Sequence, residues 1–299
     1  MLDDLESRDE IGRLTERLLS KADAHYRFPT PVDDIVAAAG LLEPRTSMLA
    51  SPILEAAPPH VSAAIKKLGR RVRAVLDRKT REIHLHPDID VQTRRSFKKL
   101  HEVAHDVYPW QKELAYADDD STLSWSTRLL FEREANQGAA ELLFQRRIFQ
   151  EVAAEYRIGM GSVIALAEQF GASIHATFRR YIESSSASVA GLVLEPSPAT
   201  LLPLSYDRHE AIHSRAFSLR MGESTAWPRR LDFPRFDFLE LVRQTKSEVP
   251  RSTSVVELPA SGRHLTVTVE VFSNFYSKFV LLWERRREWF KKSTVVIRP

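Results

Sequence analysis

Two histidines and a glutamate in the middle of the chain have the spacing of a metal site. Residues 101–105 read His-Glu-Val-Ala-His inside a predicted helix that begins near Asp88 or Asp90 and continues to Pro109. His101 and His105 share one face of that helix, about 6 Å apart along its axis. Neutral imidazoles suit zinc, which would lower the pKa of a bound water toward about 7. Glu102, beside that water, is the candidate general base for hydrolysis of a peptide bond.

A catalytic zinc site needs a third protein ligand, and the next predicted helix, over about 126–156, offers two. Glu132 is the leading candidate and Glu134 its competitor, because only Glu132 shares a face with Ala135 and Ala139. Glu134 points about 200° away. Asn136, one turn after Glu132, is placed to hydrogen-bond a ligating group. Manganese is the alternative metal, since His and Glu accept several.

The motif HEVAH followed by the E-x-x-A-N-x-x-A-A-x-L-L pattern of residues 132–143 resembles the ImmA/IrrE-type metallopeptidases over roughly residues 25–185. The resemblance implies a mostly helical zincin-like fold with a small sheet. It also implies His101, His105 and Glu132 as metal ligands and Glu102 as base. Such enzymes cleave helix-turn-helix repressors and so derepress genes. Gly138 departs from the Phe common in the family pattern, which affects local packing rather than a ligand.

The other elements are expected to form a scaffold around this site. Patterning and turn signals predict the following elements: an amphipathic helix over Leu5–Lys21, a helix in 30–40 capped by Thr30 and stopped by Gly40, a helical stretch over Val61–Leu68, a β-hairpin over about 71–86, a polar connector over 111–124, and a helix pair over 162–183 interrupted at Gly171 and capped by Ser173. The helix pair has the outline of a helix-turn-helix.

The serine-rich run 184–188 is the best linker candidate. It separates a metallopeptidase domain, residues 1–185, from a C-terminal domain, residues 189–299, that would sense a signal or recruit substrate. Strand-like pieces around 189–195, 215–220 and 264–272 make the second domain a smaller mixed α/β unit. The fold class is therefore α+β.

Composition narrows the class of protein. The 299 residues are 43% hydrophobic, enough for two cores. Lys and Arg number 43 against 40 Asp and Glu, so the net charge of +3 gives little indication of nucleic-acid binding. The absence of cysteine excludes thiol catalysis and Cys-ligated zinc. The acidic N-terminus and the lack of a long apolar run predict a cytoplasmic protein without membrane association.

Several other residues have a competing chemical interpretation. His209-Glu-Ala-Ile-His213 repeats the HExxH spacing, but no acid-bearing helix follows it, and a polar surface helix is expected. His84 and His86 share one face of a strand, which is expected to be an exposed surface strand. That strand could instead pair with an extended substrate. Tyr108 and Tyr116 are conceivable oxyanion donors, although packing is the favoured role of each.

The leading hypothesis is a zinc endopeptidase that cleaves a helix-turn-helix repressor in a bacterial or mobile-element stress response. The alternative is a DNA-binding transcriptional regulator that uses the 162–183 helix pair, with a non-catalytic HExxH helix. Residues 65–100 support it weakly, with twelve basic and four acidic side chains, an excess of eight positive charges. A weaker third hypothesis is a toxin–antitoxin component that binds a partner.

Overall fold

The computed structural model describes residues 7–50, 73–112, 124–196, 205–221, 227–233, 236–246, 251–260, 263–274 and 276–284. The chain divides into two compact units. The first contains residues 1–156 and 163–177, and the second contains residues 157–162 and 178–299. Helices dominate the first unit and a β-sheet the second, which confirms the predicted α+β class. Within the described ranges, no helix has the length and apolar character needed to cross a bilayer.

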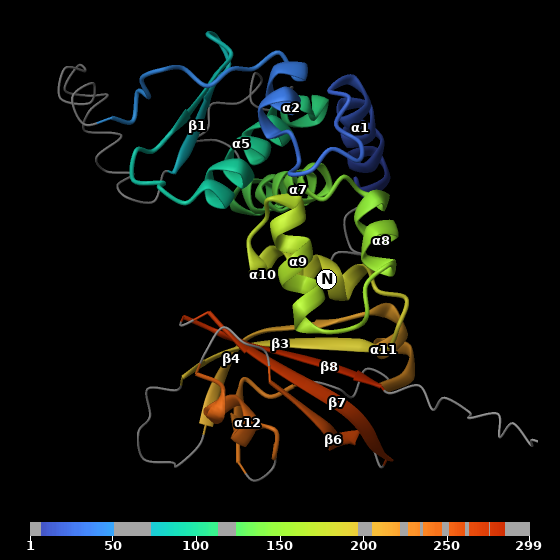
Figure 1. Cartoon of the computed structure of the whole chain (residues 1–299). Coiled ribbons are helices and arrows are strands. Elements are labelled where there is room, and N and C mark those ends of the chain that lie inside the picture. The colour runs from blue at the N-terminus through green and yellow to red at the C-terminus, as the bar shows by residue number, and fades with distance from the viewer. Residues whose placement is uncertain are drawn as a thin grey trace, which may run out of the picture. The chain divides into compact units, whose positions relative to one another are not determined.

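Helices α5 and α7 lie side by side in the first unit (Figure 1). Small residues allow this close approach, because a Cβ atom added to Gly138 would lie 3.0 Å from Cβ of Ala104. Ala135 and Ala139, on the same face of α7, are fully buried. The elements of this part are α1 Arg8–Lys21, α2 Val32–Ala38, β1 Ala74–Asp77, β2 Glu82–Leu85, α5 Gln92–Val107, α7 Trp125–Leu143 and α8 Arg147–Ala154.

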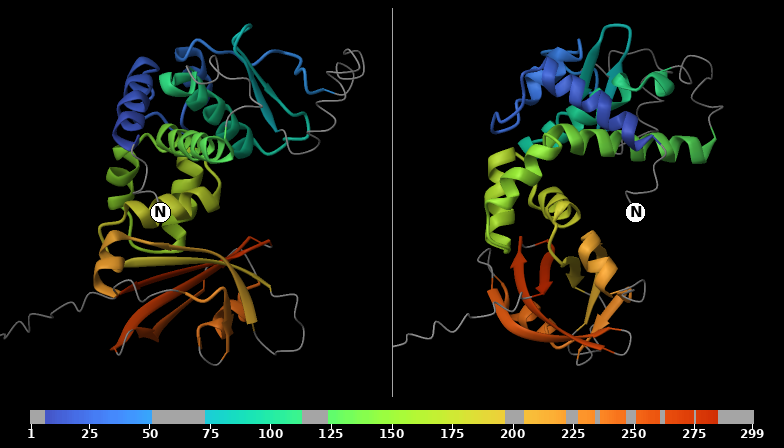
Figure 2. Two further views of the ribbon diagram at one scale, coloured as in Figure 1. Left: turned by 180° about the vertical axis from the view of Figure 1, so that it is seen from behind. Right: turned by 90° about the vertical axis from the view of Figure 1, so that its right-hand side faces the viewer.

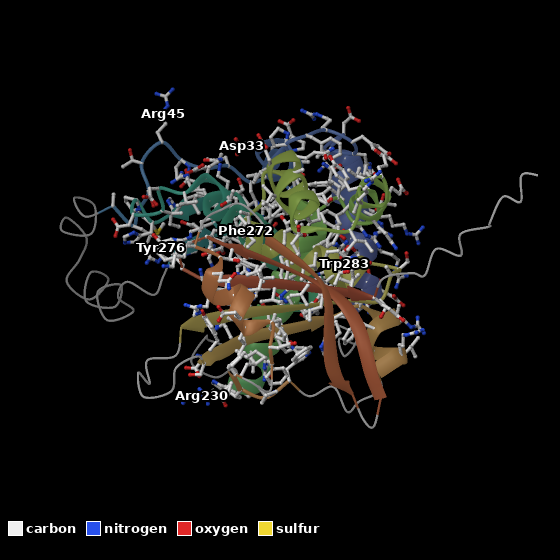
Figure 3. All side chains as sticks on the ribbon, turned by 60° about the horizontal axis from the view of Figure 1, so that its bottom comes forward. Asp33, Arg45, Arg230, Phe272, Tyr276 and Trp283 are labelled. Carbon is white, nitrogen blue, oxygen red and sulfur yellow. The ribbon has the colours of Figure 1, made fainter. Side chains whose placement is uncertain are left out.

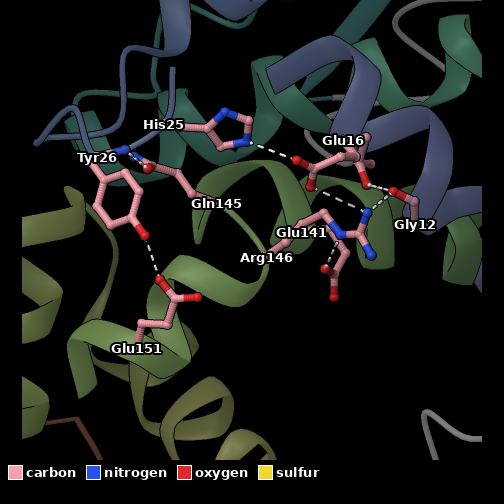
Figure 4. A network of polar contacts seen from close by, with 9 residues as sticks. Gly12, Glu16, His25, Tyr26, Glu141, Gln145, Arg146 and Glu151 are labelled. Carbon is pink, nitrogen blue, oxygen red and sulfur yellow. Dashed lines mark hydrogen bonds and ion pairs between the residues drawn. The ribbon is translucent and has the colours of Figure 1, made fainter. Parts of the chain in front are cut away.

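The prediction of one helix over about 126–156 is wrong. The chain breaks between α7 and α8, where Gln145 and Arg146 have φ of 48° and 54°, a region that side chains other than glycine rarely adopt. Gln145 is buried, and its Oε1 accepts a hydrogen bond from the backbone N of Tyr26 at 2.8 Å. Arg146 donates to the carbonyl of Gly12 in α1 (Figure 4). These long-range contacts outweigh the local helical pattern.

The predicted cap of α2 is also wrong. Pro31 is the N-cap of α2, which has no side-chain capping bond. The Thr30 hydroxyl instead donates to the carbonyl of Leu143 at the end of α7, at 2.7 Å, and so ties the two helices together. Gly40 has φ of 73° just after α2, as expected for a helix stop.

The predicted hairpin is confirmed as the antiparallel pair of β1 and β2. Arg81, in its turn, forms a bidentate ion pair with Asp106 of α5, with N···O distances of 2.6 and 2.9 Å. Arg81 also donates to the carbonyl of Ala39 just after α2, at 2.9 Å. Asp106 is almost fully buried. One guanidinium therefore fixes the hairpin and α2 against the helix that carries the HExxH motif.

The predicted helix pair is confirmed as α9, Met160–Phe170, and α10, Ile174–Ser184. Gly171 has φ of 68° between them, and Ser173 caps α10 by accepting from the backbone N of Ala176 at 3.2 Å. Both helices contribute residues to each compact unit.

The second unit contains a six-stranded antiparallel sheet in the order β5-β4-β3-β8-β7-β6, and two further views show its twist and curvature (Figure 2). The predicted strands around 189–195 and 264–272 are confirmed as β3 and β7. The strand predicted at 215–220 is wrong, because Ser214 caps a helix there by accepting from the backbone N of Phe217 at 3.1 Å. The elements are β3 Val189–Pro196, β4 Ser205–His213, α11 Arg215–Met221, β5 Arg230–Asp232, α12 Leu239–Gln244, β6 Arg251–Ala260, β7 Arg263–Ser273 and β8 Lys278–Glu284.

Both faces of this sheet are packed. On one face, the buried apolar residues include Leu192, Leu194, Phe217, Leu239, Val242, Val267, Val269, Val280 and Leu282. On the other, Phe178 and Ile182 of α10 lie over Gly191, where a Cβ atom would meet Ile182 Cδ1 at 2.2 Å. At the turn from β7 to β8, Tyr276 is exposed (Figure 3). The predicted elements at Val61–Leu68 and in 113–123, and the N-terminal residues of the first helix, lie outside the described residues.

Candidate metal centre

Helix α5 presents His101 and His105 from successive turns. Their ring centroids lie 4.7 Å apart at an interplanar angle of 82°. The helix ends at Val107 because Tyr108, the residue before Pro109, is extended with φ of −86° and ψ of 111°. Residues 109–112 are helical again, so the predicted connector begins within a second helical turn. That turn returns the chain towards His105.

Glu132 of α7 reaches both imidazoles. Its Oε2 lies 3.4 Å from Nε2 of His101, and its Oε1 lies 3.5 Å from Nε2 of His105. The two Nε2 atoms are 3.2 Å apart. Among the residues that the structure describes, this is the one group of three His, Asp or Glu side chains whose ligand atoms converge closely enough for a metal ion.

The three separations fit a single tetrahedral ion. Zinc lies about 2.0 to 2.2 Å from nitrogen and carboxylate ligands, so two ligand atoms at the tetrahedral angle stand roughly 3.3 to 3.5 Å apart. The observed distances are 3.2, 3.4 and 3.5 Å. Three electron-donating atoms that face one another in this way favour a cation between them.

The pKa shifts of the residues around the cluster agree with a preference for a cation at this position. Hydrogen bonds from His101 and His105 hold the pKa of Glu132 far below its usual range. Burial alone would lower the pKa of His105, but hydrogen bonds to Glu132 and Gln111 and the charge of Glu102 raise it overall. Burial raises the pKa of Glu102, which the two imidazoles counteract only in part. Glu102 is therefore a stronger base than an ordinary carboxylate.

The structure separates the two competing acids on α7. Glu132 lies at the imidazoles, with its side chain 61% exposed. Glu134 is 3% exposed and lies on the other side of the helix, where Trp110 and Gln111 donate to it at 2.8 and 2.7 Å. The helical-face argument therefore agrees with the structure.

The supporting role predicted for Asn136 is wrong. Asn136 is exposed, and in the described part of the chain it makes no side-chain hydrogen bond. Gln111 takes that role, with Oε1 2.7 Å from Nδ1 of His105. Gln111 was not predicted as a site residue, because its polar surroundings in the sequence favour a connector. Its role could have been predicted from the sequence, because a ligating imidazole needs an acceptor for its second N–H. Gln111 follows His105 by six residues across the Pro109 turn and can supply that acceptor.

The second HExxH sequence forms part of a strand. Residues 209–213 end β4, so the expected surface helix is wrong. Four strand residues span about 13 Å, which is too far for His209 and His213 to share one ion. His209 is also skipped in the pairing of β4 with β3, where Glu210 and Arg208 take successive partners. The same HExxH spacing thus has different geometry in the two places.

Two of the remaining candidates, His84 and Tyr108, are buried. His84 is 4% exposed, which corrects the expected surface strand, and its Nδ1 accepts from the backbone N of Met48 at 3.2 Å. His86 lies beside Asp88, with Nδ1 3.6 Å from a carboxylate oxygen. Tyr108 is fully buried, as the packing interpretation requires. Tyr116 lies outside the described residues.

Residues 62–181 match a peptidase family described as the IrrE N-terminal-like domain. The match confirms the ImmA/IrrE-type resemblance over this segment, which is shorter than the 25–185 expected and includes both α5 and α7. No curated protein matches the chain. Among solved structures, a Mycobacterium tuberculosis transcriptional regulator is similar at 12% identity and a TM-score of 0.50, covering 94% of this chain and 76% of the other. At that identity the likeness concerns the fold alone.

Proposed function

We propose that the chain is a metal-dependent endopeptidase, with zinc as the preferred ion and manganese as the alternative. The observation that carries this proposal is the convergence of His101, His105 and Glu132 beside Glu102. The match of residues 62–181 to a peptidase family supports it. In this proposal His101, His105 and Glu132 hold the ion, and Glu102 acts as the general base.

The reaction is hydrolysis of a peptide bond. A bound divalent ion supplies Lewis acidity at the scissile carbonyl. The Glu102 carboxylate removes a proton from water as its oxygen attacks the carbonyl carbon, and the same carboxylate returns that proton to the amide nitrogen as the carbon–nitrogen bond breaks. The raised pKa of Glu102 favours removal of the proton from water, because it makes the carboxylate a stronger base.

The substrate we propose is a cytoplasmic helix-turn-helix repressor, cut at a limited site so that stress-response or mobile-element genes are expressed. Residues 1–185 would form the metallopeptidase domain, and residues 189–299 would sense a signal or recruit the repressor. The exposed side of Glu132 is consistent with a protein substrate, because an extended segment can approach the site from solvent.

Direct DNA binding by α9 and α10 is less well supported. Thr177, one of the polar residues offered for base contacts, is fully buried, and its hydroxyl donates to the carbonyl of Ser173 at 3.0 Å. Arg179 forms ion pairs with Glu210 and Glu183. The basic segment 65–100 is partly neutralised as well, since Lys99 lies 2.6 Å from Glu43.

The first experiment is elemental analysis of purified protein after zinc is supplied. We expect one zinc per chain in wild type, loss in His101→Ala, reduction in Glu132→Ala and retention in His209→Ala. The last variant is a matched control, because it removes a histidine from the second HExxH sequence. Absence of metal from the wild type would refute the proposal, and salt-sensitive DNA binding by the same protein would favour the regulator alternative.

The second experiment separates metal binding from catalysis. Candidate repressors are incubated with wild type or with Glu102→Gln, which retains the three ligands. We expect cleavage by wild type to be at least 100-fold faster than by the variant, because the variant has no general base. Equal cleavage by both proteins would assign the activity to a contaminating protease.

A further inference from the structure

A buried amide links His105 to a carboxylate that is not a ligand. Gln111 is 2% exposed. Its Oε1 lies 2.7 Å from Nδ1 of His105, and its Nε2 donates to Oε2 of Glu134 at 2.7 Å. The same nitrogen lies 3.4 Å from the carbonyl of Phe131. The amide therefore bridges the metal cluster and the buried side of α7.

The orientation of this amide follows from its partners. Oε2 of Glu134 also accepts from the Trp110 indole, and the carbonyl of Phe131 can only accept, so the NH2 group of Gln111 must face Glu134 and Phe131. The carbonyl oxygen of Gln111 must then face His105. An oxygen at Nδ1 can only accept, so Nδ1 carries a hydrogen in both the neutral and the protonated ring. In the protonated ring Nε2 donates to Glu132, and in the neutral ring Nε2 is left as the free electron pair that faces Glu132.

Glu134 is held in place by three donors from two parts of the first unit, the residue before α1 and the helical turn after Pro109. The Ser7 hydroxyl donates to Oε1 at 2.5 Å, and the Trp110 indole donates to Oε2 at 2.8 Å. Together with Gln111, these are neutral groups. In the described part of the chain no basic side chain pairs with Glu134, so Ser7, Trp110 and Gln111 are the groups that hold its carboxyl in place.

We propose that Glu134 and Gln111 form a positioning relay that presets the tautomer and ring orientation of His105. This inference rests on the proposed function, because the relay leaves Nε2 of His105 free to bind the metal ion. Imidazole ligands in metal sites usually donate their second N–H directly to a carboxylate or carbonyl, and here an amide stands between the two. Glu134 is a positioning residue and touches neither the ion nor the substrate.

The two histidines of the cluster differ in this respect. Nδ1 of His101 is buried and has no hydrogen-bond partner within the described residues. His105 is preset by the relay through Nδ1, whereas the polar contacts of His101 are made by Nε2, with Glu132 and His105. The relay therefore predicts that changes at Gln111 and Glu134 alter the state of His105 and leave His101 unchanged.

The first test reads the tautomer without any metal. The imidazole nitrogens of metal-free protein are observed by nitrogen-15 NMR at about pH 9, where histidine is neutral. We expect His105 to be a single Nδ1–H tautomer in wild type and a mixture in Gln111→Leu. In Glu134→Gln the tautomer is retained, because a Gln carbonyl can still accept from Gln111 and Trp110. A mixture in wild type, or no change in Gln111→Leu, would overturn the relay.

The second test measures zinc affinity by competition with a chelator. We expect Gln111→Leu and Glu134→Leu to bind zinc about 10 to 100 times more weakly than wild type, and Glu134→Gln to restore most of the affinity. Gln137→Leu is the matched control, because Gln137 is another buried amide that donates to a carboxylate, Glu141, at 2.9 Å. A purely structural role would lower affinity equally in the control.

The two tests separate the relay from the proposed function. Tight zinc binding by wild type and equally tight binding by Gln111→Leu would refute the relay and leave the peptidase proposal intact. No zinc binding by wild type would refute the peptidase proposal. The NMR measurement alone would then decide whether Gln111 and Glu134 set the tautomer of His105.

Discussion

The hydroxyl of Tyr108 occupies the position that the first side-chain atom of residue 138 would take. A Cβ atom added to Gly138 would lie 1.8 Å from that oxygen and 2.9 Å from the adjacent ring carbon. Tyr108 stacks on Trp110 at a centroid distance of 5.0 Å. This arrangement explains why a glycine stands where the family pattern has Phe, because the ring of Tyr108 fills the space between α5 and α7.

Replacing Gly138 with alanine is therefore expected to destabilise the protein. The added methyl group cannot fit unless Tyr108 moves, and overpacking of this kind costs about 1 to 3 kcal/mol in the free energy of unfolding. Urea denaturation of Gly138→Ala and of the double variant with Tyr108→Phe would measure the cost. We expect a smaller cost in the second background, where the hydroxyl is absent, and equal costs would contradict the proposed clash.

Tyr108→Phe alone is expected to stabilise the chain by about 1 kcal/mol. The hydroxyl is fully buried and lacks a hydrogen-bond partner within the described residues, so it loses hydration without compensation. Thermal unfolding monitored by circular dichroism would show a higher midpoint for the variant. A lower midpoint would mean that the hydroxyl makes a stabilising contact.

Removal of the Arg81 guanidinium is expected to destabilise the first unit. Among the described residues, Arg81→Met leaves the buried Asp106 with only Lys112, at 3.4 Å, and we expect a loss of about 2 to 4 kcal/mol in the free energy of unfolding. Arg78→Met, in the same turn, is the control. Because Asp106 follows His105 directly, the affinity for zinc should also fall in Arg81→Met. An Arg81→Met variant as stable as wild type would argue against the ion pair as a major constraint on the fold.

The second unit is expected to lose stability in mild acid through His213. Burial, with a smaller effect from the charge of Arg208, lowers the pKa of His213, whose Nε2 accepts from the Trp227 indole at 2.9 Å. The unfolded chain titrates near 6.5, so it binds the proton first as the pH falls. The stability contribution is therefore complete above about pH 6.5 and is lost as the pH falls towards the folded pKa.

Urea unfolding at about pH 7.5 and pH 5.5 checks this assignment. We expect the loss between the two values to be smaller in His213→Gln, which keeps an acceptor for Trp227, than in wild type. His209→Gln changes an exposed histidine on the same strand and should behave as wild type. An unchanged pH dependence in His213→Gln would assign the titration to other groups.

Sequence reasoning succeeded where local signals determine the structure. The HExxH helix, its end before Pro109 and the Gly171 and Ser173 signals of the helix pair all depend on neighbouring residues. Helical geometry alone placed Glu132, and not Glu134, on the face of α7 that meets the two imidazoles.

The failures involve contacts between distant parts of the chain. Gln145 and Arg146 interrupt a helical pattern because their partners come from the α1 region, more than a hundred residues away. His84 is buried by a loop contact with Met48 that strand alternation does not reveal. The role of Gln111 depends on Glu134 of a different helix.

The uneven exposure of the three ligand candidates has a kinetic consequence. The His101 and His105 side chains are 5% and 19% exposed, whereas that of Glu132 is 61% exposed. An ion held by these three side chains would be bound to two buried histidines of α5 and to one solvent-exposed carboxylate of α7. Rotation of one surface carboxylate would be enough to begin its release. The rate at which the ion exchanges with a chelator would then depend on the mobility of Glu132, and the supply of free metal would set the metal-loaded fraction of the protein without any change in the fold.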